Sequence, residues 1–141
     1  MKVTAICMFF AILTHQGNSQ GINEIQKKRG EVLEEIVSQL EKRYRDAKGA
    51  GGRQELIRAR IRLYQFHRDH AKDRAQKIDF QSKIEALRKL QLNELKSSYE
   101  EGVEGITSVE VLRAEERHLA AQQKLLELST LSTEGGDSQS K

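Results

Sequence analysis

The chain has 141 residues but no proline and no tryptophan, and aromatic residues make up only 5% of it. Proline removes a backbone donor and breaks helices, so its absence permits long uninterrupted helices. Charged residues account for 32% of the sequence, and this balance suits solvated helices better than a globule with a thick core. The composition therefore predicts an all-α protein.

Cysteine is almost absent as well, since Cys7 is the only one. It lies inside an apolar run, residues 3–13, that follows Lys2 and precedes small residues at 17 and 19. A positive charge, a short apolar run and small residues at a cleavage site are typical of a secretory signal peptide, which we place at 1–19. Its removal would leave a chain without disulfide or thiolate chemistry.

An uncleaved membrane anchor is the alternative for this segment. The apolar run is short for that role, because a helix needs about 20 apolar residues to cross a bilayer. No later segment is apolar enough to span a membrane. We therefore expect an exported protein that is periplasmic or associated with the outer membrane, with secretion as the alternative.

Three helices are predicted for residues 20–131, over about 23–47, 53–98 and 108–131. Glycines at 49, 51 and 52 end the first helix, and apolar residues recur at intervals of three and four along the first and third. The second contains neither proline nor glycine. The last ten residues, 132–141, are polar and glycine-containing, and we expect a disordered tail.

The predicted lengths indicate an elongated antiparallel coiled coil. At 1.5 Å per residue the central helix is about 70 Å long, while each outer helix is about 36 Å. The two short helices then lie end to end along the long one. A segment without large apolar residues, 67–77, is the junction, and a bend there gives the alternative of a compact three-helix bundle.

The charge distribution favours pairing within the chain. Residues 42–96 contain 16 basic and 7 acidic side chains, whereas residues 97–141 contain 4 basic and 9 acidic. A basic middle between acidic flanks is satisfied internally, and stacking aromatics are few, so the pattern disfavours a nucleic-acid role. Exposed ion pairs contribute only about 0–1 kcal/mol each, so apolar seams supply most of the stability.

Catalytic groupings are scarce. His67 and His70 lie one turn apart with Asp73 nearby, and they are weak candidates for a metal site because no distant third ligand cluster appears. Ser97 and Ser98 have no adjacent base, and the glycines at 49–52 lack the residues of a phosphate loop. We expect no enzyme activity, no cofactor and no small-molecule substrate.

The most informative segment joins the second and third helices. Tyr99 and Gly102 precede a turn at Gly105, and Thr107 and Glu110 have the spacing of a capping box. The apolar helix that follows begins with Val111, Leu112, Ala114 and Leu119.

This segment resembles the outer-membrane efflux protein family, the TolC-type channel-tunnels, whose repeats carry a Tyr-x-x-Gly, a Thr or Ser and an acidic-Val-Leu-x-Ala pattern. Here Thr107 follows Gly102 by five residues rather than about three, so the turn differs from that of the family. The resemblance implies long helices from a tunnel wall. Only one copy of the motif is present, so a complete channel is not expected.

Together these features predict a structural role: self-association or binding to helical proteins of the cell envelope, with a link to efflux transport implied by the resemblance. Two other functions stay open. A small periplasmic adaptor or chaperone would bind clients through an apolar groove, and a metal- or anion-binding regulator would use the histidine region.

Overall fold

The computed structural model describes the backbone of residues 4–47 and 50–130 and the side chains of residues 21–45 and 52–130. Within these ranges the protein consists of helices and contains no strand, which confirms the all-α class. The helices are α1 (Thr4–Ala47), α2 (Ala50–His70), α3 (Arg74–Glu100) and α4 (Ser108–Thr130). The expected disordered tail, 132–141, lies outside the described residues.

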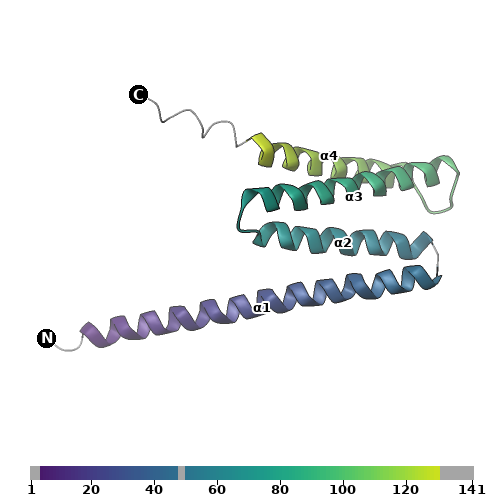
Figure 1. The fold of residues 1–141 in the computed structure, drawn as a ribbon. Helices are drawn as coiled ribbons and strands as arrows, with labels where there is room; N and C mark the ends of the chain where they lie inside the picture. The colour runs from purple at the N-terminus through teal and green to yellow at the C-terminus, as the bar shows by residue number, and fades with distance from the viewer. Residues whose placement is uncertain (1–3, 48–49, 131–141) are drawn as a thin grey trace, which may run out of the picture.

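The described residues form four helices where three were predicted, and the prediction of one central helix over 53–98 is wrong. The chain leaves helical geometry after His70 and re-enters it at Arg74. The halves, α2 and α3, lie side by side and antiparallel (Figure 1). The elongated arrangement is therefore incorrect, and the bend considered for 67–77 occurs at 71–73.

A helix cap explains the break. Asp73 has an extended backbone, with φ −112° and ψ 162°, and its carboxylate accepts a hydrogen bond from the Gln76 amide at 2.8 Å. An aspartate at the N-cap satisfies one of the free amides of the first turn. On the other side, His67, Arg68 and His70 place basic groups at the C-terminal end of α2, where the helix dipole favours them.

The helices follow one another in a serpentine order, and over the described part of the chain the backbones in close contact are those of α1 with α2, α2 with α3 and α3 with α4 (Figure 1). The first and last helices, α1 and α4, therefore form the two edges of the layer. The N-terminal part of α1 projects beyond the other three helices in Figure 1. The edges keep faces that no other helix of the chain covers.

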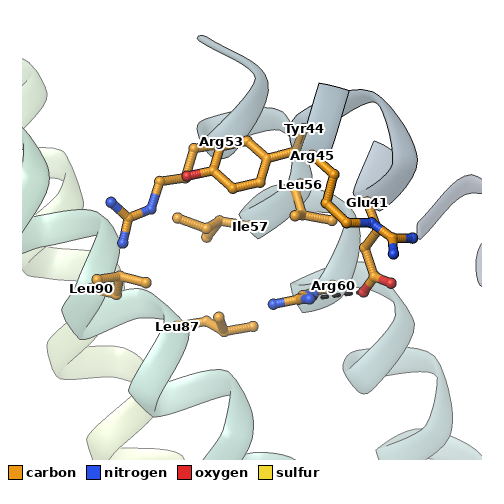
Figure 2. A pocket seen from close by; sticks show the side chains of 9 residues that line it. All are labelled: Glu41, Tyr44, Arg45, Arg53, Leu56, Ile57, Arg60, Leu87 and Leu90. Carbon is orange, nitrogen blue, oxygen red and sulfur yellow. Dashed lines mark hydrogen bonds and ion pairs between the residues drawn. The ribbon is translucent and has the colours of Figure 1, made fainter. Parts of the chain in front are cut away.

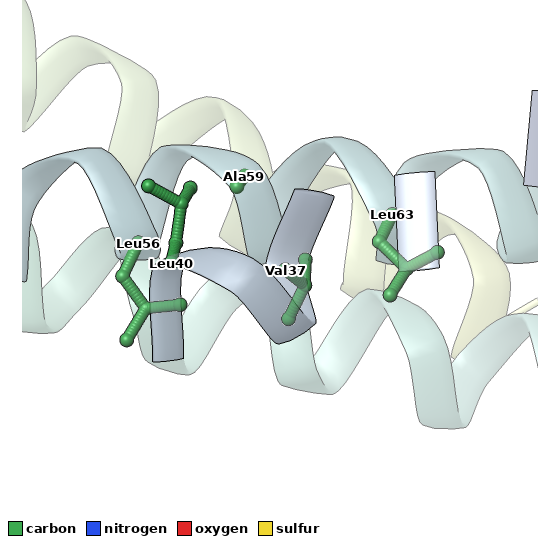
Figure 3. Close-up of a cluster of buried hydrophobic side chains, with 5 residues drawn as sticks. All are labelled: Val37, Leu40, Leu56, Ala59 and Leu63. Carbon is green, nitrogen blue, oxygen red and sulfur yellow. The ribbon is translucent and has the colours of Figure 1, made fainter. Parts of the chain in front are cut away.

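The first apolar cluster joins α1 to α2 (Figure 3). Val37 and Leu40 of α1 meet Leu56, Ala59 and Leu63 of α2, and all five are buried. Their spacings of three and four residues keep each set on one face of its helix. An ion pair reinforces this contact, since the Arg60 guanidinium lies 2.7 Å from the Glu41 carboxylate.

A second cluster joins α2 to α3 and α4. Ile57 and Ile61 of α2 pack with Ile84 of α3 and Ala121 of α4. Because residues 57 and 61 lie on a different side of α2 from residues 56, 59 and 63, this helix is apolar on two sides. That property makes α2 an inner helix of the layer.

The connection between α3 and α4 is held by caps at both ends. Gly102, with φ +71°, donates from its amide to the Tyr99 carbonyl at 3.1 Å, and Val103 donates to the Ser98 carbonyl at 2.9 Å. These two bonds constitute a Schellman motif, in which glycine adopts the left-handed conformation. Gly105 has φ +87° in the same connection.

None of the described helices is both long and apolar enough to cross a lipid bilayer. The backbone of residues 4–19 is helical and continuous with the rest of α1, while the side chains of these residues lie outside the described set. The signal peptide over 1–19 stays a prediction.

Candidate docking surface on helix α4

One face of α4 forms its seam with α3. Ala114, His118 and Ala121 are buried there, and Val111, Leu125 and Leu128 are partly buried. Two alanines in the centre permit a close approach of the two helices. These six positions recur at intervals of three and four, as in a coiled-coil seam.

The opposite face of α4 is also apolar, but it is open to solvent. Val109, Leu112, Leu119 and Leu126 are 51%, 62%, 57% and 64% exposed. We call these four residues the outer stripe of α4. Each position of the stripe precedes a position of the inner seam by two residues, which corresponds to about 200° around the helix. The helix therefore carries two apolar faces and uses only one within the chain.

The outer stripe has the heptad order of a second seam, with Glu116 and Gln123 at the two remaining positions. A shallow hollow of about 430 Å³ lies on it, and its lining combines apolar with polar residues: Leu112, Glu115, Glu116, Leu119, Ala120 and Gln123. A small residue between large ones provides the hole into which a side chain of another helix packs.

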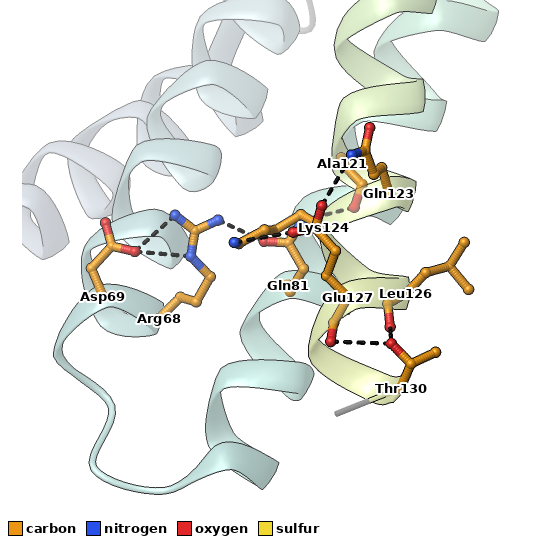
Figure 4. A network of polar contacts seen from close by, with 9 residues as sticks. All are labelled: Arg68, Asp69, Gln81, Ala121, Gln123, Lys124, Leu126, Glu127 and Thr130. Atoms are coloured by element: carbon orange, nitrogen blue, oxygen red, sulfur yellow. Dashed lines mark hydrogen bonds and ion pairs between the residues drawn. The ribbon is translucent and has the colours of Figure 1, made fainter. Parts of the chain in front are cut away.

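Polar contacts fix α4 against the helices behind it (Figure 4). The amide of Gln81, a side chain only 1% exposed, donates to the Ala121 carbonyl at 2.9 Å and accepts from Arg68 of α2 at 2.6 Å. At the C-terminal end of α4, Arg74 Nε donates to the Leu128 carbonyl at 2.7 Å. The outer stripe is therefore presented on a helix whose rotation is fixed.

The capping box predicted at the start of α4 is confirmed. The Thr107 amide donates to the Glu110 carboxylate at 2.9 Å, and the Glu110 amide donates to the Thr107 hydroxyl at 3.3 Å. The two residues satisfy each other's free groups and set the first residue of the helix.

The other motif residues are divided between the two faces and the turn. Tyr99 is exposed near the end of α3, while Gly102 and Gly105 shape the connection. Ala114 is buried in the inner seam, whereas Leu112 and Leu119 belong to the outer stripe. The motif therefore builds a helical hairpin and also supplies half of the exposed apolar surface.

The pKa values of two charged side chains near the outer stripe are lowered. Burial lowers the pKa of the Arg88 guanidinium, and the neighbouring Arg117 cation lowers it further, while the Glu116 carboxylate opposes both. Near the other end of α4, hydrogen bonds from Gln123 and then from Lys124 lower the pKa of the exposed Glu127 carboxyl. These contacts are local to α3 and α4, and they involve Glu116 and Gln123, the two polar residues of the seam.

A second exposed apolar row lies on the other edge of the layer, where Ile22, Ile25, Val32 and Ile36 of α1 face solvent. Arg29 interrupts this row, and its guanidinium lies 5.8 Å from the centre of the Phe66 ring. The row begins where α1 projects beyond α2.

The histidines proposed as weak metal ligands point to different partners. His67 Nε2 lies 3.6 Å from the Glu34 carboxylate and its ring stacks on Phe80, whereas His70 Nδ1 lies 2.7 Å from the backbone oxygen of Phe66. Asp73 is occupied as the cap of α3. Among the residues whose placement is described, no three histidine, cysteine or acidic side chains are grouped as a metal site.

The polar centre of the protein was not foreseen from the sequence. Gln81 and His118 are buried between helices, and His118 Nδ1 lies 3.6 Å from Glu85. Glutamine and histidine are common on helix surfaces, so their residue types gave no signal. The spacing of 114, 118 and 121 is the signal that places His118 in the seam.

Comparison with known protein families, with curated proteins and with solved structures finds no significant match to this chain. The resemblance of residues 99–128 to the efflux family stays a prediction.

Proposed function

We propose that this chain is an exported, non-enzymatic helical protein that associates with a second copy of itself through the outer stripe of α4. One observation carries the proposal. A helix already packed on one side presents three leucines and a valine, each more than half exposed, in heptad order on its other side. An exposed apolar surface of this regularity is typical of a protein interaction site.

The two copies pair antiparallel. Val109 then lies opposite Leu126 of the second copy, and Glu116 lies opposite Leu119 of the second copy, so a large aliphatic side chain fills every layer. A parallel pair would place Glu116 against its own copy, and like charges within a seam are destabilising. Antiparallel pairing about a two-fold axis also closes the assembly as a dimer.

The strength of this contact is moderate. Eight half-exposed apolar side chains, at about 1 kcal/mol each, give a gross stabilisation of about 8 kcal/mol before the cost of association. We therefore expect a reversible dimer whose population depends on concentration.

Light scattering coupled to size-exclusion chromatography tests the association. The molar mass of the purified chain should rise towards that of a dimer as concentration increases, and Leu112→Lys with Leu119→Lys should hold it at the monomer value. The matched control, Ile25→Lys with Val32→Lys, places the same charges on the exposed row of α1 and should leave the dimer intact. A monomer at every concentration would overturn the proposal, and loss of the dimer in the control alone would move the interface to α1.

Residues 1–19 support export to the periplasm or the outer-membrane surface, because Lys2 is followed by an apolar run and then by small residues. Fusion of this segment to a phosphatase that is active only outside the cytoplasm tests export. We expect activity from the natural segment and none when charged residues interrupt the apolar run.

A further inference from the structure

A groove crosses α2 between α1 and α3, at the end of the layer where α1 is connected to α2 (Figure 2). Its volume is about 450 Å³, within the range of about 300–1,000 Å³ that is common for small-molecule sites. The lining residues come from all three helices, so the groove exists only in the folded protein.

Aliphatic side chains form one part of the lining. Leu56 and Ile57 come from α2, and Leu87 and Leu90 come from α3. The α2 pair is buried, whereas the two α3 leucines are only partly buried and pack at the border of the second apolar cluster. This surface offers no hydrogen-bonding group, and it therefore suits the apolar part of a ligand.

Cations surround this apolar surface, since Arg45, Arg53 and Arg60 line the groove, with Glu41 as the one carboxylate among the described lining residues. Arg53 lies 2.8 Å from Glu94, and Arg60 lies 2.7 Å from Glu41. These two arginines are held in place by their acidic partners.

Arg45 differs from the other two arginines. It is exposed in the last turn of α1, and within the described part of the chain it forms no ion pair and no hydrogen bond. Among the described lining residues, Arg45 is therefore the arginine without an ion-pair partner. Tyr44 crosses the groove with its hydroxyl towards Arg53 and adds a further donor (Figure 2).

We infer that this groove binds a small amphipathic organic anion, with its apolar body on Leu87 and Leu90 and its acidic group at Arg45. A guanidinium pairs well with a carboxylate or a phosphate, and an aliphatic surface excludes highly polar molecules. The site is distinct from the outer stripe of α4 and does not depend on dimer formation.

Decanoate, decanol and decyltrimethylammonium provide the test, because they share one tail and differ in the charge of the head group. The chain is titrated with each at concentrations below micelle formation, and the resonances of Tyr44, Leu87 and Leu90 are followed by NMR. We expect saturable binding of decanoate, at least fivefold weaker binding of decanol, and none of the cation. Equal affinity for decanoate and decanol would overturn the inference.

Arg45→Gln should lower the affinity for decanoate roughly tenfold and leave that for decanol unchanged, since it removes one charged contact. Because Arg45 is exposed and forms no ion pair or hydrogen bond within the described part of the chain, this variant should unfold like the natural chain. The control, Arg62→Gln, changes an exposed arginine of α2 outside the groove and should bind decanoate normally. Equal effects of the two variants would contradict the site.

An anionic lipid also combines an acidic head group with an apolar tail, so it is a second source of the ligand. Co-sedimentation with vesicles of phosphatidylcholine, with and without phosphatidylglycerol, separates the two sources. Binding to anionic vesicles that Arg45→Gln abolishes and Arg62→Gln preserves would support the site with lipid as its ligand. Equal binding of both variants to the vesicles, with no saturable binding of decanoate, would overturn the inference.

Discussion

At the scale of single residues, Gln81 links three of the four helices. Its side chain is 1% exposed and bonds to Arg68 of α2 and to the backbone of Ala121 in α4 (Figure 4). A buried amide is tolerated because both of its polar atoms have partners. The contact also fixes which turn of α4 lies beside which turn of α3.

Gln81→Ala should lower the free energy of unfolding by about 2–3 kcal/mol, since it removes both hydrogen bonds and leaves a cavity. Gln81→Met keeps the volume and should cost about 1–2 kcal/mol. Urea titration followed by circular dichroism measures both, with Gln76→Ala on the exposed side of α3 as the control that should change little. A methionine variant as stable as the natural chain would show that the polar contacts add no stability.

The Glu127 carboxyl provides a prediction about pH. Its pKa lies below the ordinary value of 4.5, first because Gln123 donates to it at 3.0 Å and then because Lys124 does so at 3.3 Å. A lowered pKa means that the carboxylate stabilises the folded state above its unfolded pKa, and that this contribution is lost as pH falls through the folded pKa.

Gln123→Ala should therefore raise the pKa of Glu127 towards its ordinary value. Carbon-13 NMR of the carboxyl groups, at a concentration where the chain is monomeric, follows the titration directly. Gln122→Ala is the matched control, because its amide reaches Glu85 instead. An unchanged pKa of Glu127 in the Gln123 variant would assign the shift to Lys124.

At the scale of the elements, local caps decide where the helices begin and end. Gly102, at φ +71°, ends α3 in a conformation that disfavours residues with a side chain. Nothing lies within 4 Å of the position of an added Cβ there, so the backbone alone sets the cost of a substitution.

Gly102→Ala should destabilise the protein by about 1 kcal/mol. The control, Gly52→Ala, makes the same change inside α2, where an added Cβ meets only ordinary contact with Tyr44, and it should stabilise the protein by about 0.5–1 kcal/mol. Thermal and urea unfolding should give opposite signs for the two variants. A shared sign would contradict the assignment of Gly102 as a left-handed cap.

The sequence was sufficient for the helix class and for the capping box at Thr107, because both depend on neighbouring residues. A bend within 67–77 was only the alternative, indicated by the lack of large apolar residues there, and no glycine or proline is present to place the break at 71–73. Asp73 and Gln76 have the same spacing as Thr107 and Glu110, so the signal was present in the form of a cap. A segment without glycine or proline can therefore still contain a chain reversal where a capping residue starts a new helix.

At the scale of the whole molecule, a layer of helices leaves more apolar surface open than a closed bundle does. The outer stripe of α4 follows from this arrangement, because an edge helix has a neighbour on one side only. Sequence periodicity detects both apolar faces of α4 but does not tell which one is covered. That distinction depends on contacts between distant residues. The groove that crosses α2 between α1 and α3 depends on such contacts as well.

The reversal of the chain at 71–73 is the feature on which the layer depends, and it has a direct test. Glu55 and Asn93 are exposed, and their neighbours Arg53 and Glu94 are in contact at 2.8 Å. Spin labels at 55 and 93, in a chain with Cys7→Ser, should lie within about 20 Å, since packed helices are about 8–10 Å apart. One continuous helix would separate the two positions by about 57 Å.

Labels at 76 and 93, both in α3, serve as the internal standard, because about 26 Å is expected in either arrangement. A distribution centred near the longer distance, with the standard unchanged, would remove the serpentine order and with it the groove between α1 and α3.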